Sequence, residues 1–77
     1  MLVSDTVLNI RVRNAIQCDA ELGDLGLRVT VTDGVVTLEG RVPNERLKHQ
    51  AGEIAEGVYG VDEVDNRIAV LFEELAG

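Results

Sequence analysis

Apolar and polar residues alternate over residues 27–42, which predicts two β-strands joined by a tight turn. With Asp33 and Gly34 as the loop residues of a type I′ turn, the strands are antiparallel and Arg28 lies opposite Glu39. This register gathers the core residues on one face: Leu27, Val29, Val31, Val36, Leu38, Gly40 and Val42. A slip by one residue would bury charge and expose valine, so the pattern specifies the register. We expect Gly40 to let a helix pack closely on the sheet.

Two segments with helical periodicity flank this hairpin. The first is expected to begin after Ser4 or Asp5 and to run to about Asp19 or Ala20. The second is expected to begin after Pro43, with Asn44 as its N-cap. The buried stripes are Leu8, Val12, Ala15 and Ile16 in the first helix, and Leu47, Ala51, Ile54, Ala55 and Val58 in the second.

A third strand is expected over residues 63–71, with Asn66 on its core face. Gly57 and Gly60 bracket the end of the second helix, and one of them is expected to take the left-handed conformation that ends it. We expect the amide of Asn66 to hold the backbone of the preceding turn. The predicted order is α-β-β-α-β, an α+β fold with a three-stranded mixed sheet and two helices packed on one of its faces.

Composition fits one small domain, which we place at residues 4–71, with residues 72–77 as a C-terminal tail. The chain has 77 residues and is 45% apolar, without an apolar run near the roughly 20 residues of a membrane span. Cys18 is the only cysteine, so no internal disulfide can form. The N-terminus lacks a basic region followed by an apolar run. We expect a cytoplasmic protein as written, and a periplasmic or envelope protein if the domain belongs to a longer exported chain.

Charge is unevenly distributed along the chain. The net charge is −7; residues 49–77 hold seven acids and one base, which leaves −6 there and −1 in residues 1–48. A nucleic-acid partner requires a basic surface that displaces counterions from phosphate, so we exclude nucleic acid. The same balance disfavours, without excluding, docking on an anionic membrane.

A longer motif extends beyond the hairpin. The run V-x-V-x-D-G-V-V-T-L-x-G-x-V at residues 29–42 is followed by A-x-x-I-A at residues 51–55 and by G-V-x-x-V-x-N-x-I-x-V at residues 60–70. This pattern resembles the BON domain family. The resemblance implies a three-stranded sheet backed by two helices, in proteins that are often periplasmic or envelope-associated. Family members are proposed to bind phospholipid or to attach proteins to membranes, and some occur in osmotic-stress proteins.

The first helix carries the candidate binding residues. At 100° per residue, Ile10 lies almost opposite Leu8, between Arg11 and Arg13, with Val7 and Asn14 nearby, and no acid occurs between Thr6 and Cys18. Arginines could contact lipid phosphate while Ile10 enters the headgroup layer. A single exposed isoleucine is also ordinary on a protein surface. A third interpretation is a protein contact through Val7, Ile10 and Cys18, for example with a second copy.

Other candidate sites are weaker. His49 lies one helical turn from Glu45 and from Glu53, but no second histidine or cysteine cluster supports a metal site. The acids of residues 62–65 could attract cations, and a potassium-binding protein occurs in the family, yet they lack calcium-loop spacing. Tyr59 is either a ligand contact or a structural corner.

Function is predicted to be binding, not catalysis. No nucleophile with a base in reach, phosphate-cradling loop or dinucleotide motif is present, so we expect no enzyme, cofactor or metal. The first hypothesis is a phospholipid-binding module that acts through Val7, Ile10, Arg11, Arg13 and Asn14. The alternative is a protein-interaction or self-association module that uses a helix face or a strand edge, and potassium sensing is the third.

Overall fold

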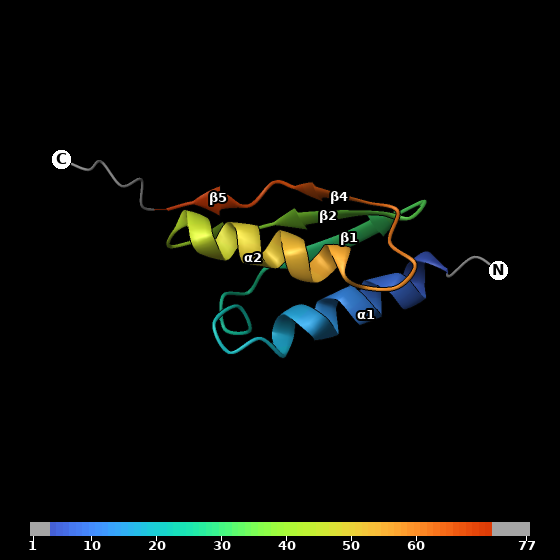
Figure 1. Ribbon diagram of the computed structural model, residues 1–77, viewed down its shortest axis with the longest axis horizontal. Helices are drawn as coiled ribbons and strands as arrows, with labels where there is room; N and C mark the ends of the chain where they lie inside the picture. The colour runs from blue at the N-terminus through green and yellow to red at the C-terminus, as the bar shows by residue number, and fades with distance from the viewer. Residues whose placement is uncertain (1–3, 72–77) are drawn as a thin grey trace.

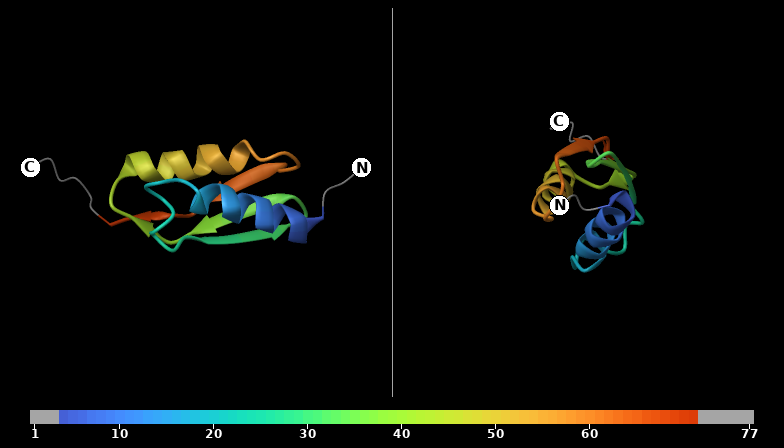
Figure 2. Two further views of the ribbon diagram at one scale, coloured as in Figure 1. Left: turned by 90° about the horizontal axis from the view of Figure 1, so that it is seen from below. Right: turned by 90° about the vertical axis from the view of Figure 1, so that its right-hand side faces the viewer.

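The computed structural model describes residues 4–71 and contains two helices on one face of a β-sheet. The elements are α1 (Asp5–Gln17), β1 (Arg28–Thr32), β2 (Val35–Glu39), β3 (Arg41–Val42), α2 (Glu45–Glu56), β4 (Glu63–Asn66) and β5 (Ala69–Val70). Figure 1 shows α1 and α2 side by side, and Figure 2 shows that both cover the same side of the sheet and leave the other side open. The predicted α+β architecture is therefore confirmed. The predicted tail at residues 72–77 lies outside the described residues.

The hairpin has the register that the sequence predicts. Arg28 pairs with Glu39 and the remaining partners follow in order to the pair that flanks the turn. Asp33 and Gly34 have φ values of 52° and 83°, as a type I′ turn requires. Both carboxylate oxygens of Asp5 accept hydrogen bonds at this turn, from the Asp33 N–H at 2.8 Å and the Gly34 N–H at 3.1 Å. The first turn of α1 is thus fixed to the tip of the hairpin.

The third predicted strand is divided in two, although its register continues across the break. β4 pairs with β2 in parallel and β5 pairs with β3 in parallel, which makes the sheet mixed. Leu38 faces Asn66 and Arg41 faces Ala69, a separation of 28 residues in each case (38 to 66 and 41 to 69). The Arg67 N–H donates to the Leu38 carbonyl at 2.9 Å between the two pieces. The strand order of the larger sheet is β1-β2-β4.

Gly40 interrupts the second strand of the hairpin, for a reason that differs from our expectation. Its φ is 139°, and a Cβ there would lie 2.7 Å from Leu27 Cδ2. The space beside Gly40 is therefore filled by the side chain of Leu27. The expectation that Gly40 makes room for a helix was wrong.

Both helices end differently from the prediction. α1 begins after the Ser4 cap but stops at Gln17, because the Asp19 carboxylate accepts hydrogen bonds from the backbone N–H groups that follow it and stabilises a separate turn. α2 begins after Asn44 as predicted and ends at Glu56. Gly57 has a right-handed φ of −79°, whereas Gly60 has a φ of 101° in the turn toward β4. The left-handed glycine therefore shapes that turn and does not end the helix directly.

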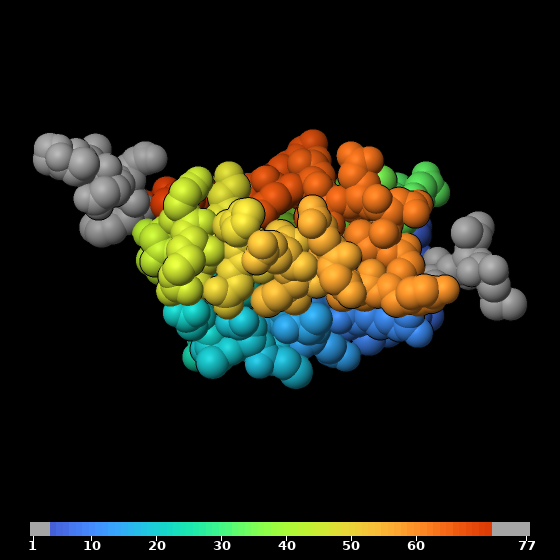
Figure 3. Space-filling view, viewed as in Figure 1, coloured from blue at the N-terminus to red at the C-terminus, as the bar shows by residue number. Residues whose placement is uncertain are grey.

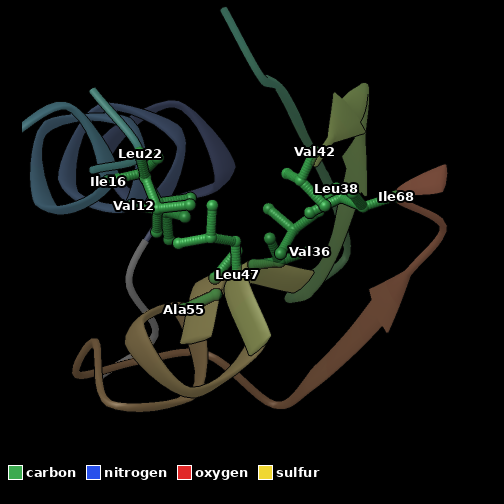
Figure 4. Close-up of a cluster of buried hydrophobic side chains, with 10 residues drawn as sticks. Val12, Ile16, Leu22, Val36, Leu38, Val42, Leu47, Ala55 and Ile68 are labelled. Carbon is green, nitrogen blue, oxygen red and sulfur yellow. The ribbon is translucent and has the colours of Figure 1, made fainter. Parts of the chain in front are cut away.

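The core lies between the helices and the sheet. Figure 4 shows its labelled side chains converging from both layers: Val12, Ile16, Leu22, Leu47 and Ala55 on one side, and Val36, Leu38, Val42 and Ile68 on the other. Leu22 belongs to the loop after α1, is only 1% exposed and has no place in the predicted stripes. This loop residue therefore completes the core between the two layers.

Asn66 joins the sheet to α2. Its Nδ2 donates to the Lys48 carbonyl at 2.8 Å, and its Oδ1 accepts from the Ile68 N–H at 3.2 Å. Our expectation that Asn66 holds the preceding turn was wrong, because its partners lie in α2 and in the residues that follow. A Cβ on Gly52 would lie 2.9 Å from Asn66 Nδ2. Gly52 therefore makes the space that the amide occupies.

We predict that Gly52→Ala destabilises the protein, against the usual helix preference. Alanine is ordinarily about 1 kcal/mol better than glycine inside a helix. Here the new methyl group displaces a doubly hydrogen-bonded amide, so we expect the free energy of unfolding to fall by about 1–2 kcal/mol in urea titrations. In an Asn66→Ala background the same substitution should be stabilising. A stabilising Gly52→Ala in the wild-type background would contradict the interpretation.

Candidate functional site

The outer face of α1 carries all five candidate residues. Leu8, Val12 and Ile16 are buried, and the opposite side of the helix is open to solvent. Ile10 is 48% exposed and Val7 39% exposed. We define the α1 outer face by its exposed members: Val7, Ile10, Arg11, Arg13 and Asn14. In Figure 3, α1 forms a long rim of the molecule beside α2.

The two arginines of this face are available to an anion. Within residues 4–71, neither Arg11 nor Arg13 forms a salt bridge, whereas Arg46 lies 2.8 Å from Glu21 and Arg67 lies 2.8 Å from Asp65. Asp5 is the only acid in α1, and the hairpin turn occupies both of its carboxylate oxygens. The face therefore combines apolar side chains with two arginines that have no salt-bridge partner in the part of the chain that the structure describes. Its role as a binding site stays a prediction.

Side chains at both ends of α1 hold the helix in its orientation. Near the first end, Asn9 Nδ2 donates to the Val29 carbonyl at 3.0 Å. Beyond the other end, Asp19 Oδ2 accepts from Gln50 Nε2 at 2.8 Å. Sequence reasoning did not identify these contacts, because each joins residues 20 or more positions apart. They prevent α1 from rotating and keep its apolar and basic residues outward.

The remaining candidate residues do not form a shared site. His49 Nε2 lies 3.2 Å from the Glu53 carboxylate, and both side chains are exposed. The Asp62 carboxylate lies beside Gly34, while Asp65 binds Arg67. Tyr59 is 79% exposed, so its ring is not a packed structural corner. Among the residues that the structure describes, no three His, Cys, Asp or Glu side chains are placed to hold a metal ion.

Hydrogen bonding lowers the pKa of two acids in the loop after α1. The pKa of Asp19 falls below its ordinary value because the backbone N–H groups of Leu22 and Glu21 donate to its carboxylate. The pKa of Glu21 falls because the Arg46 guanidinium donates to it, and Glu21 in turn raises the pKa of Arg46. These acids therefore stabilise the loop in their ionised form.

We predict that the loop's contribution to stability is lost in acid. A carboxyl group with a lowered pKa in the folded state stabilises the protein above its unfolded pKa, and the effect disappears as the pH falls through the folded value. Asp19→Asn should therefore reduce the urea midpoint at pH 7, and the difference from wild type should shrink toward about pH 2. A difference that is the same at both pH values would show that the charge of Asp19 does not contribute.

Within residues 4–71, neither helix is long and apolar enough to span a bilayer.

Comparison with known proteins agrees with the fold. The BON domain family matches residues 4–71. Outer membrane lipoprotein DolP from Haemophilus influenzae is 39% identical to the chain over 69 residues, which cover 88% of the chain and 36% of DolP. The chain thus spans about a third of the length of this relative. Since the family match includes both helices and the whole sheet, the chain belongs to the BON domain family.

Proposed function

We propose that this BON domain is a non-catalytic module that binds the surface of a phospholipid membrane through the α1 outer face. The observation that carries the proposal is Ile10, which is 48% exposed between two arginines that form no salt bridge within residues 4–71. An outer membrane lipoprotein among its relatives supports a role at the cell envelope, within a longer protein.

The chemistry of the face suits the boundary between headgroups and acyl chains. Guanidinium groups bind phosphate oxygens in a bidentate manner, so Arg11 and Arg13 would contact lipid phosphates. Ile10 and Val7 would enter the apolar boundary beneath them. Each arginine near an anionic surface contributes about 1 kcal/mol. Because Ile10 is already about half buried, burial of the rest of its side chain contributes only about 1 kcal/mol. The sum gives weak, reversible attachment, which suits a module of a longer protein.

The rest of the molecule must face away from the membrane. Seven of the fourteen acids lie in residues 49–77, a segment with a single base. β4 carries part of this charge and lies at the opposite edge of the sheet from β1, on which α1 packs. The charge distribution thus favours a single orientation, with α1 toward the lipid.

We predict that the double substitution Arg11→Glu, Arg13→Glu weakens binding to anionic liposomes by about tenfold or more, because two attractive charges become repulsive. The measurement is co-sedimentation with neutral and with anionic vesicles, at low and at physiological salt. Wild-type binding should require anionic lipid and should decrease with salt.

The control is Arg28→Glu, Arg41→Glu, which gives the same net charge. Both of these arginines are exposed, and each precedes a valine that packs in the core (Val29 and Val42), so strand alternation directs the arginine side chains to the other face of the sheet. We expect this variant to bind nearly as well as the wild type, with folding of both variants checked by circular dichroism. Equal losses in the two variants would show that only net charge matters, and no binding by the wild type would refute membrane binding by this domain.

A further inference from the structure

β1 is an edge strand, and only some of its outward N–H and C=O groups form hydrogen bonds within residues 4–71. Thr32 and Val35 flank the two-residue turn and exchange hydrogen bonds, so Val29 and Val31 direct their N–H and C=O groups away from β2. The hydrogen bond from Asn9 Nδ2 to the Val29 carbonyl agrees with this geometry. Within residues 4–71, no turn or side-chain group hydrogen-bonds to the backbone of Val31. The edge is therefore open at Val31.

A groove runs beside this open edge, beneath α1. The groove is open to solvent, has a volume of about 340 Å³ and is lined by Asp5, Thr6, Asn9, Ile10, Arg13 and Val31. Ile10 and Val31 provide apolar surface, while Arg13 provides a positive charge that no acid of the described residues neutralises by a salt bridge. Backbone hydrogen-bonding groups, apolar surface and a cation without a salt-bridge partner among residues 4–71 thus lie together.

The position of α1 decides what can occupy the groove. α1 packs on β1, and its Asn9 reaches the outward carbonyl of that strand. Pairing of two β1 edges would bring the strands to about 4.8 Å, and with them the two α1 helices. Packed helices require about 8–10 Å between their axes, so a second copy does not fit edge to edge in an antiparallel pairing, which puts both helices on the same face. A single extended segment has no such helix and can lie beneath α1.

We propose that β1 and the groove bind an extended peptide segment of a partner protein, which adds a strand to the sheet. Its backbone would hydrogen-bond to Val31, its alternate apolar side chains would contact Ile10 and Val31, and an acidic side chain would pair with Arg13. Peptide binding does not require membrane binding, although Ile10 and Arg13 belong both to the α1 outer face and to the groove. Peptide and membrane would therefore compete for this side of α1.

The test is selection from a random heptapeptide library displayed on phage, followed by titration of the selected peptides. These should alternate apolar and polar residues and contain an acid. Val31→Pro removes an outward N–H without breaking the β1–β2 ladder, and proline is tolerated at such edge positions. We expect this variant to bind the peptides about tenfold more weakly, since it loses a hydrogen bond and gains a steric clash.

Arg13→Glu and Arg11→Glu form a matched pair that is decisive even if Val31→Pro fails to fold. Only Arg13 lines the groove, so only its reversal should weaken peptide binding, whereas both should weaken binding to anionic liposomes. Val31→Pro should leave liposome binding unchanged. The proposal fails if no peptide is selected, or if the peptides bind Val31→Pro as tightly as the wild type. It also fails if gel filtration shows a dimer that Val31→Pro dissociates.

Discussion

The carboxylate of Asp5 accepts hydrogen bonds from two consecutive backbone N–H groups at the tip of the hairpin. The positions of the α1 outer face and of the groove beside β1 both depend on this contact. A type I′ turn exposes these donors, because its central residues leave them without ladder partners. Asp5 also lies in the first turn of α1, where the helix dipole favours a negative charge. One side chain therefore serves the helix and the turn, and joins elements separated by 28 residues in sequence.

A helix fixed at one point could still rotate about its axis, and further contacts prevent this. Asn9 binds the edge carbonyl of β1, and beyond the helix Asp19 binds Gln50 of α2. Burial of Leu8, Val12 and Ile16 then leaves one side of α1 in solvent. Because these contacts settle the helix orientation, exposure of Ile10 is a property of the fold. A surface that is already formed binds without the cost of ordering it.

Sequence reasoning predicted the features that depend on local pattern and failed where contacts are distant. The Asp33–Gly34 turn was predictable because its conformation requires those residue types and alternation fixes the register. The predicted register places Leu27 opposite Gly40, but alternation alone does not show that the Leu27 side chain fills the space beside this glycine, so its role was misinterpreted. The need for glycine at position 52 becomes clear only when α2 and β4 are packed together, because the amide of Asn66 then occupies the space that a larger side chain would fill. The outer face of α1 was predictable as a surface, but its edge groove required the strand order.

Net charge alone does not decide whether this domain could bind an anionic membrane, as we propose. At physiological ionic strength the screening length is about 8 Å, so a phosphate near Ile10 responds mainly to charges in its immediate surroundings. β4 and its acids are separated from β1 by two strand spacings, about 10 Å, before the width of α1 is added. Repulsion from the acids is thus weak at the α1 outer face and strong wherever β4 approaches the membrane. In the proposed membrane-bound state, the net charge of −7 would therefore select the orientation of the domain and would not prevent binding.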